Sequence, residues 1–328
     1  MRAVISDYSE ENERYVSVRN VQCPKLTKNE VLIKVESVSL NFADVSAIRG
    51  DYHSLGGEYF IPGFDCAGTI VEVGENVERF SIGDRVVGFP NGGALADYVS
   101  VDCNLVYNVP ENVSFDDAVA ILSIGITAYE LVHKVAKVKA SDKVLVHAAA
   151  GGVGLTLLQL LQKQNTTIYG TVGNEEKEKL IKKRGVNQAI LYRKEDFQKK
   201  IMDLTEGKGV DIVFDSVGGE VLEKSMKCLA SYGKLITYGH ASGTPGQILS
   251  TDLHSTSKSV LGYSSGQRQH DSPGSLRVSA ETVLTLLSTD ELDVKISEKL
   301  NLEEVNKGFQ LMADRGNIGK IIIKLTDS

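Results

Sequence analysis

Residues 144–162 read Val144-Leu145-Val146-His147-Ala148-Ala149-Ala150-Gly151-Gly152-Val153-Gly154-Leu155-Thr156-Leu157-Leu158-Gln159-Leu160-Leu161-Gln162. An apolar run, a glycine-rich turn and an amphipathic run follow one another, which predicts a strand, a tight turn and a helix. Ala149, Gly151 and Gly154 fit the dinucleotide-binding pattern, with alanine in place of its first glycine. Such a turn directs unpaired backbone N–H groups and the positive end of the helix dipole at a diphosphate. We therefore expect a diphosphate to contact Ala150, Gly151, Gly152, Val153 and Gly154.

Two other interpretations fit part of this stretch. A glycine turn between an ordinary strand and helix satisfies the pattern taken alone, so the neighbouring segments decide between them. A transmembrane helix of about 20 apolar residues is excluded, because a Gly-Gly pair, His147 and Gln159 interrupt the run and Asp142 and Lys143 directly precede it. We expect His147 itself to be a hydrogen-bonded core histidine rather than an acid or base.

The segments after the helix indicate which dinucleotide binds. An apolar run, 167–172, ends at Gly173, about 20 residues after the turn, where an acidic residue would bind the ribose of NAD. Gly173 instead leaves space, and Lys177, Tyr192 and Arg193 could surround a 2′-phosphate with cationic and hydrogen-bonding groups. These residues favour NADPH over NADH. Alternatively, Lys177 does not contact the phosphate and is a solvent-exposed charge on the helix surface, among the charged residues Glu175, Glu176, Glu178 and Lys179.

The composition narrows the class of protein. A chain of 328 residues is long for one hydrophobic core, so two domains are expected. Its net charge of −7 argues against binding to nucleic acid or an anionic membrane, because both need clustered cations. The four cysteines form no CxxC pair, so neither a disulfide framework nor a structural zinc site is indicated. The N-terminus lacks the apolar core of a signal peptide, which predicts a cytoplasmic location.

Two kinds of secondary structure divide the chain. Residues 1–122 contain short alternating runs, such as 30–35 and 68–74, which predict a mostly β domain with a short helix starting near Asn41. From residue 123 to 255, strands and helices alternate, which predicts a doubly wound parallel sheet covered on both faces. Ligands of such sheets lie beyond the carboxyl ends of the strands, and this brings Ser216 and Gly239 near the cofactor.

Residues 256–328 are expected to return to the first domain. The part from 256 to 276 is rich in serine, glycine and polar residues and predicts a mobile loop around one strand, 259–262. A helix, 279–288, and a final strand, 320–325, follow. Since the final strand cannot extend the nucleotide sheet without leaving the β domain, the nucleotide-binding domain would be an insertion.

Together these segments resemble the zinc-free quinone oxidoreductases of the medium-chain dehydrogenase/reductase superfamily, and also its vesicle amine transport protein-like branch. The resemblance covers essentially the whole chain. It implies an α/β protein with a GroES-like, mostly β catalytic domain (1–122 and 256–328) and a Rossmann nucleotide-binding domain (123–255). The motifs that carry it are Ser39-Leu40-Asn41-Phe42-Ala43-Asp44, Arg49-Gly50-Asp51-Tyr52, Pro62-Gly63-Phe64-Asp65-Cys66-Ala67-Gly68, Val73-Gly74, Gly83-Asp84-Arg85-Val86, Thr127-Ala128-Tyr129, His147 to Gly154 and Asn317-Ile318-Gly319-Lys320.

The resemblance also implies that no zinc is needed. Zinc alcohol dehydrogenases of the superfamily would place cysteine, histidine and cysteine ligands at positions matching Asn41, Phe64 and Ser123, and none of these side chains suits tetrahedral zinc. Without a Lewis acid, alcohol oxidation is implausible. What the resemblance implies instead is hydride transfer from NADPH to a quinone or another activated enone.

Site residues carry over from the family one by one. Asn41 and Tyr52 would supply hydrogen bonds in the substrate cleft, Thr127 would lie near the nicotinamide, and Asn317 near the diphosphate or nicotinamide. The residues alone also permit a helix-cap role for Asn41, and packing roles for Tyr52 and Thr127. Ser46 departs from the family, because several relatives carry a second tyrosine there.

Other functions and partners stay open. The enzymatic alternative reduces the carbon–carbon double bond of alkenals or enoyl thioesters, and the non-catalytic alternative is an NADPH-binding sensor or vesicle-associated protein. The sequence contains no lipid anchor or basic amphipathic helix that would attach the chain to a membrane. The resemblance implies a homodimer in which the strand 259–262 pairs across a two-fold axis.

Overall fold

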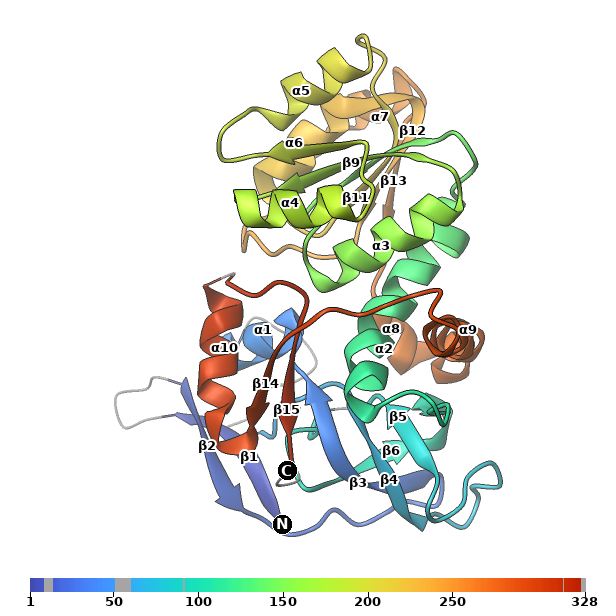
Figure 1. Cartoon of the computed structure of the whole chain (residues 1–328), viewed down its shortest axis with the longest axis vertical. Helices are drawn as coiled ribbons and strands as arrows, with labels where there is room; N and C mark the ends of the chain where they lie inside the picture. Colours follow the sequence, from blue (N-terminus) through green and yellow to red (C-terminus); the bar gives the residue numbers. More distant parts are fainter. Residues whose placement is uncertain (9–13, 51–59, 91, 315, 326–328) are drawn as a thin grey trace. The chain divides into compact units, whose positions relative to one another are not determined.

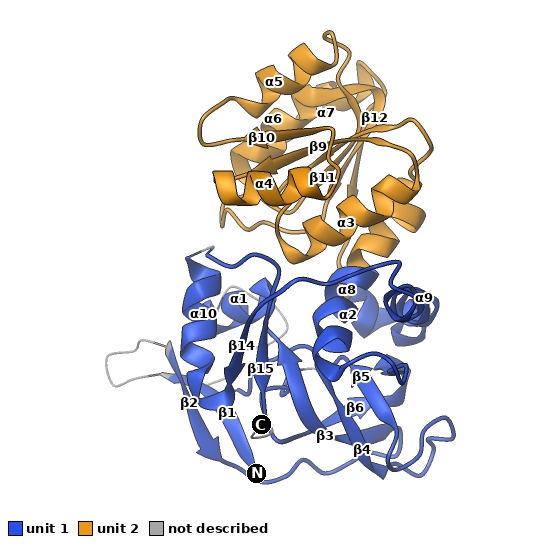
Figure 2. Cartoon of the chain, in the orientation of Figure 1, with its two compact units in different colours: residues 1–126, 267–328 blue, residues 127–266 orange. Residues whose placement is uncertain are grey.

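The computed structural model describes residues 1–8, 14–50, 60–90, 92–314 and 316–325. The chain forms two compact units, one of Met1–Ile126 with Gln267–Ser328 and one of Thr127–Gly266 (Figure 2). The second unit is therefore an insertion within the first. It starts at Thr127, inside the predicted 123–255, and ends at Gly266, eleven residues past the predicted end.

The first unit is built around a seven-stranded sheet with the order β14-β15-β3-β4-β5-β7, in which β6 also pairs with β3 (Figure 1). The last strand, β15, pairs antiparallel with β3, with Ile323 opposite Val38. This pairing returns the C-terminal segment to the sheet of the N-terminal strands. The strands of this unit are β1 (Arg2–Tyr8), β2 (Arg14–Asn20), β3 (Glu30–Ser39), β4 (Cys66–Val73), β5 (Arg85–Gly88), β6 (Tyr98–Asp102), β7 (Val106–Asn108), β14 (Ile296–Asn301) and β15 (Lys320–Lys324).

Helices and short helical turns form part of the connections between the strands of this sheet. Helix α1 starts directly after Asn41, as predicted, and ends at Gly50, whose φ of 83° is a left-handed conformation that glycine adopts without strain. Helix α2 starts in this unit and continues into the π-helical segment η2 (Leu131–Ala136) of the second. This combined helix is long and apolar enough to cross a membrane, but 72% of its apolar window is buried, as in the core helix of a globular protein. The helices are α1 (Phe42–Arg49), α2 (Phe115–Glu130), α9 (Arg277–Ser288) and α10 (Val305–Ala313), with short turns η1 (Cys103–Leu105), η3 (Pro273–Leu276) and η4 (Leu302–Glu304).

The second unit is a doubly wound sheet of six parallel strands in the order β10-β9-β8-β11-β12-β13. Figure 1 shows α3 and α4 on one side of the sheet and α5 and α6 on the other. Both faces of the central strands are buried, which explains why their sequences are continuous apolar runs. The elements are β8 (Lys143–Val146), α3 (Gly152–Lys163), β9 (Thr167–Val172), α4 (Glu175–Lys183), β10 (Gln188–Leu191), α5 (Phe197–Leu204), β11 (Val210–Asp215), α6 (Gly219–Cys228), β12 (Leu229–Thr237), α7 (Ser250–His254) and β13 (Ser259–Gly262).

The segment 256–276 differs from the mobile loop that its composition predicts. Strand β13 pairs in parallel with β12, with Ser259 opposite Lys234, so it extends the nucleotide sheet and moves the end of the second unit past residue 255. Helix α8 (Ser265–Asp271) and the turn η3 follow it. None of the residues of α8 is buried, so no apolar periodicity marks this helix in the sequence.

Candidate active site

The turn between β8 and α3 has the geometry of a diphosphate-binding turn. Gly151 precedes the helix, its N–H bonds Ala148 O at 2.9 Å, and no described side chain caps it. A Cβ atom at Gly154 would lie 2.5 Å from Ala148 O, so glycine is required for the helix to pack this closely on the strand. The first-turn N–H groups, including those of Gly152 and Val153, therefore suit an anion.

The alanine at the first glycine position is accommodated by the neighbouring strand. Ala149 is fully buried, and its N–H bonds Thr171 O at 3.1 Å. A Cβ atom at Gly170 of β9 would lie 3.0 Å from the Cβ of Ala149 and 2.9 Å from Ile181 Cδ1. The methyl group of Ala149 thus occupies space that Gly170 leaves open, and the turn keeps its shape.

The predicted cofactor residues of the second unit lie at one edge of its sheet. Because all six strands are parallel, their carboxyl ends share that edge. Gly173 follows β9, Tyr192 follows β10, Ser216 follows β11, and Gly239 is two residues beyond β12. The chain order reverses between β8 and β11, which is where sheets of this type bind ligands. Ser216 and Gly239 are neighbours, because a Cβ atom at Gly239 would lie 3.1 Å from Ser216 O.

Gly173 and Tyr192, two residues of the predicted 2′-phosphate subsite, lie next to each other. A Cβ atom at Gly173 would lie 3.0 Å from Tyr192 Oη, so the absent side chain makes room for the phenol. The Tyr192 side chain is 43% exposed and can donate to a ligand. Lys177 lies in the first turn of α4, where its N–H bonds Asn174 Oδ1 at 2.9 Å.

Local ion pairs reduce the negative charge around Lys177. Glu175 pairs with Lys194 and Glu178 pairs with Lys182, both at 2.5 Å. The hydrogen bond from Lys194 lowers the pKa of Glu175. Two of the acidic neighbours that made Lys177 ambiguous in the sequence are thus neutralised by other lysines, which lowers the repulsion that a phosphate would meet.

Asn41 belongs to a buried hydrogen-bonded cluster of the first unit. Its Oδ1 accepts from Lys320 Nζ at 2.6 Å, and its Nδ2 donates to Asp65 Oδ2 at 3.1 Å and to Ser39 O at 3.2 Å. Lys320 Nζ also donates to Leu40 O at 2.8 Å, and Ser39 Oγ donates to Asp65 at 2.9 Å. The side chain of Asn41 therefore has partners that a helix cap does not require.

A second carboxylate, Asp44, closes the cluster from α1. Its Oδ2 accepts from the N–H of Asn41 at 2.7 Å and its Oδ1 from the N–H of Gly63 at 3.0 Å. Burial raises the pKa of Asp44 to about 7, and burial also raises the pKa of Asp65 and lowers that of Lys320. Titratable groups whose pKa values are shifted by burial and mutual charge are typical of functional sites.

Four members of this cluster were missed as site residues in the sequence: Ser39, Asp44, Asp65 and Lys320. Each stands inside a motif that carried the family resemblance, but no role was assigned to it. The available signal was a charge within an apolar segment, as at Asp65 before Cys66-Ala67 and at Lys320 before three isoleucines. Such charges are buried only with partners, and the sequence does not identify those partners.

The remaining predicted residues are distributed between the units. Tyr52 lies outside the described residues. Thr127 is 8% exposed and belongs to the second unit. Asn317 belongs to the first unit, where its Nδ2 donates to Gly319 O at 2.9 Å in the turn before β15. The roles of these three residues at the nicotinamide or the substrate stay predictions.

His147 is a core histidine, as predicted. Its ring is 2% exposed, with Nδ1 2.9 Å from Thr171 Oγ1 and Nε2 2.8 Å from Ser225 Oγ. Because Ser225 donates its hydroxyl to Val221 O, it accepts from Nε2, so the histidine is neutral with its proton on Nε2. Burial lowers the pKa of His147 to about 3.

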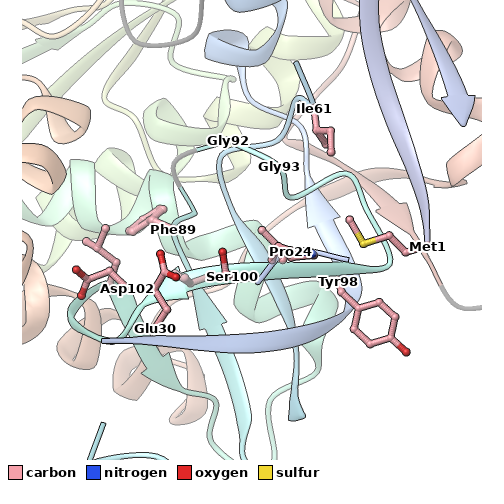
Figure 3. Close-up of a pocket in the computed structure, with 13 residues that line it drawn as sticks. Met1, Pro24, Glu30, Ile61, Phe89, Gly92, Gly93, Tyr98, Ser100 and Asp102 are labelled. Carbon is pink, nitrogen blue, oxygen red and sulfur yellow. The ribbon is translucent and has the colours of Figure 1, made fainter. Parts of the chain in front are cut away.

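A metal-binding group and a surface pocket are two other features that a second site could use. Among the residues that the structure describes, no three His, Cys, Asp or Glu side chains are grouped so that they could hold a metal ion. A pocket of about 290 Å³ lies along β6 in the first unit and is shown in Figure 3. Its lining includes Glu30, Tyr98 and Asp102 but none of the predicted site residues.

Comparisons with known proteins give the family. An alcohol dehydrogenase GroES-like domain model matches residues 27–111, and a zinc-binding dehydrogenase model matches residues 152–281. A probable quinone oxidoreductase of Schizosaccharomyces pombe is 34% identical over 92% of this chain and 91% of its own length. A 2-haloacrylate reductase of a Burkholderia species is 30% identical over 90% of each chain.

Two more proteins extend the comparison. A synaptic vesicle membrane protein VAT-1 homolog of Danio rerio is 33% identical over 92% of this chain, which spans only 65% of that relative's length. The crystal structure of Escherichia coli quinone oxidoreductase complexed with NADPH superposes with a TM-score of 0.91 and 26% identity, over 99% of this chain and 100% of that one. The fold, the turn at Gly151 and these matches agree: the chain belongs to the quinone oxidoreductase-like group of the medium-chain dehydrogenase/reductase superfamily.

Proposed function

We propose that the protein is an NADPH-dependent reductase that delivers hydride to a quinone or another activated enone without a metal. The observation that carries the proposal is the common carboxyl edge of the second unit, where the Gly151–Gly154 turn suits a diphosphate and the Tyr192 hydroxyl lies against Gly173. NADPH, when bound, would supply the hydride. The quinone oxidoreductase relatives support this class of reaction.

The cluster around Asn41 supports a reaction without a metal. Asn41 stands at a position that matches a zinc ligand in the metal-dependent relatives, and Lys320 Nζ lies 2.6 Å from its Oδ1. An ammonium group at this oxygen repels a divalent cation. This electrostatic repulsion predicts that the purified, active protein contains no stoichiometric zinc. Metal analysis tests the prediction, and stoichiometric zinc would contradict it.

In this mechanism the residues of the first unit hold and stabilise the acceptor. The Asn41 N–H bonds to Ser39 O and Asp65 Oδ2 are at the long end of the normal range. An acceptor oxygen that gains negative charge binds such an N–H more strongly than the neutral carbonyl of Ser39 does, so it would take over the Nδ2 hydrogen that now bonds Ser39 O while the amide keeps its orientation. Tyr52 stays the predicted proton relay and Thr127 the predicted neighbour of the nicotinamide.

The cofactor preference is tested at Lys177. Lys177→Ala should weaken NADPH binding about tenfold and leave NADH binding unchanged, because only NADPH carries the 2′-phosphate. Isothermal titration with both coenzymes measures the two dissociation constants. Lys179→Ala, two residues further along the same helix and therefore on another face of it, is the matched control and should change neither constant. Equal losses for both coenzymes would remove Lys177 from the phosphate subsite.

The acceptor is tested with a panel of quinones, alkenals and haloacrylates in the presence of NADPH. Quinone turnover supports the proposal. Turnover of alkenals or haloacrylates alone would favour carbon–carbon double-bond reduction, which the 2-haloacrylate reductase relative makes the second candidate. Tight NADPH binding with no turnover would favour a non-catalytic role, in line with the VAT-1 homolog. A cytoplasmic location stays a prediction.

We also propose a homodimer. Strand β13 is the outer strand of the second unit's sheet, and its residues Ser259 and Gly262 are exposed. Its free edge can pair with the same strand of a second copy. Val260→Pro, which removes one backbone N–H from this edge, should shift the mass measured by light scattering from dimer to monomer. An unchanged dimer would place the interface elsewhere.

A further inference from the structure

Lys320 and Asp65 lie where they determine which way the Asn41 amide points. The two ends of an asparagine amide have nearly the same shape, so the group can turn over and exchange its donor for its acceptor. An ammonium offers only donors, so Lys320 at 2.6 Å fixes Oδ1 on its side. Asp65 accepts a hydrogen bond from Ser39 Oγ as well as from Asn41 Nδ2, as an ionised carboxylate does. A cation on one side and an anion on the other permit one orientation.

We propose that Lys320 and Asp65 are positioning residues that hold the Asn41 amide with its nitrogen as the donor for the acceptor molecule. The inference rests on the proposed function, in which Asn41 contacts the acceptor oxygen. Lys320 is 4% exposed and Asp65 fully buried. Lys320 and Asp65 are linked through the amide of Asn41, and buried charges contribute little net stability relative to apolar side chains of similar volume, so a role in orientation explains why charges occupy this place.

The same strand supplies a matched control. Lys324 lies four residues after Lys320 on β15 and is also part of an ion cluster, in which it donates to Asp116 at 2.7 Å and to Ser37 at 2.9 Å. None of these contacts involves Asn41. Replacing Lys324 therefore measures the effect of removing a paired lysine from β15 without removing a contact to Asn41.

The experiment is a double-mutant cycle between Lys320 and Asn41. Asn41→Ala should lower kcat/KM for the quinone about 100-fold, since it removes a donor to the developing oxyanion. Lys320→Met should lower it about tenfold while the dissociation constant of NADPH stays unchanged. Because Lys320 acts through Asn41, the double variant should lose no more than Asn41→Ala alone. Lys324→Met should stay within about twofold of wild type.

A second readout does not depend on turnover. The side-chain amide of Asn41 gives a pair of NMR signals that Asn41→Ala removes and thereby identifies. Lys320→Met should accelerate the exchange of the Asn41 side-chain amide hydrogens with water about tenfold, and Lys324→Met should not. If wild type reduces no acceptor, the proposed function fails while this measurement still tests the positioning role. If Lys320→Met does not fold, Asp65→Asn, which keeps the side-chain shape, takes its place in both measurements.

Three results would overturn the inference. In the first, the losses caused by Lys320→Met and Asn41→Ala multiply in the double variant, as for independent sites. In the second, Lys324→Met lowers turnover as much as Lys320→Met, which would reduce both lysines to a general effect on the sheet. In the third, the exchange rate of the Asn41 amide is the same with and without Lys320.

Discussion

The two lysines of β15 form two ion clusters that differ in what they do to their carboxylates. Around Lys324, burial tends to raise the pKa of Asp116, but hydrogen bonds from Lys299, Lys324 and Ser37 outweigh it and lower the pKa to about 2. Around Lys320, burial dominates and raises the pKa of Asp44 to about 7. The Lys324 cluster stabilises the ionised form of Asp116, whereas burial in the Lys320 cluster destabilises the ionised form of Asp44.

This difference agrees with the roles proposed for the two clusters, one in the fold and one in the acceptor site. In the Lys324 cluster, Asp116 of α2 accepts from lysines of β14 and β15, so it ties three elements together. In the Lys320 cluster, the contacts converge on one amide, that of Asn41. Similar residue types and similar distances therefore serve different ends, and the sign of the carboxylate pKa shift distinguishes them.

The largest expected effect is on the pH dependence of stability. The raised pKa of Asp44 means that the folded protein keeps its proton while the unfolded chain loses it, so this group's contribution falls as pH rises from about 4 to about 7, by at most about 4 kcal/mol. The stability of Asp44→Asn relative to wild type should therefore increase over that range. Urea unfolding of both proteins at several pH values measures it.

Asp116 and His147 change the stability with pH in the direction opposite to Asp44 in the same experiment. Asp116 loses its contribution only as pH falls from about 3.8 towards 2, and His147 as pH falls from about 6.5 towards 3. Both are present in wild type and in Asp44→Asn, so they cancel in the difference. A difference that stayed flat from pH 4 to 7 would mean that the Lys320 cluster carries no costly charge, and the contrast between the clusters would break.

The next effect is on turnover. Asp65→Asn should lower kcat/KM for the acceptor about 30-fold, because an amide at this position can accept from the nitrogen of Asn41 or donate to its oxygen and so no longer enforces one orientation. Asp116→Asn makes the same chemical change in the Lys324 cluster and should stay within about twofold of wild type. Steady-state kinetics at saturating NADPH checks both variants. Equal losses in the two would show that the clusters do not differ in function.

The smallest effect is on the free energy of unfolding at neutral pH. Asp116→Asn should lower it by about 1.5 kcal/mol, because Lys299 and Lys324 lose the carboxylate that accepts from both. Asp65→Asn should lower it by less, since removing a desolvated charge offsets part of the lost hydrogen bonds. Urea unfolding at pH 7.5 gives both values. The reverse order would contradict the assignment of the Lys324 cluster to the fold.

The nucleotide-binding unit could be predicted from the sequence in most of its elements. Strand β9 has the predicted bounds, 167–172, because strands buried on both faces appear as uninterrupted apolar runs. Strand β13 was predicted but not its place in the sheet, because a short strand next to polar residues carries no information about its partner. Helix α8 was missed because it buries nothing.

The cluster around Lys320 could not be predicted, because its members are far apart in the chain. The register of three strands assembles it: Val38 of β3 lies opposite Cys66 of β4 and opposite Ile323 of β15. This alignment brings the end of β3, the start of β4 and β15 together, and with them Asn41, Asp65 and Lys320. Sequence patterns predict strands, but the register between strands that are distant in the chain depends on the packing of the whole sheet.

The pairing of Ala149 with Gly170 changes how the dinucleotide pattern should be read. The pattern is usually written along one loop, yet here the methyl group admitted at its first position is matched by a missing one on the adjacent strand. In this chain the side-chain volume at the two positions together, rather than a glycine at the first, lets the turn keep its shape. A search that required glycine at the first position would reject this chain, whereas a search that scored both positions jointly would retain it.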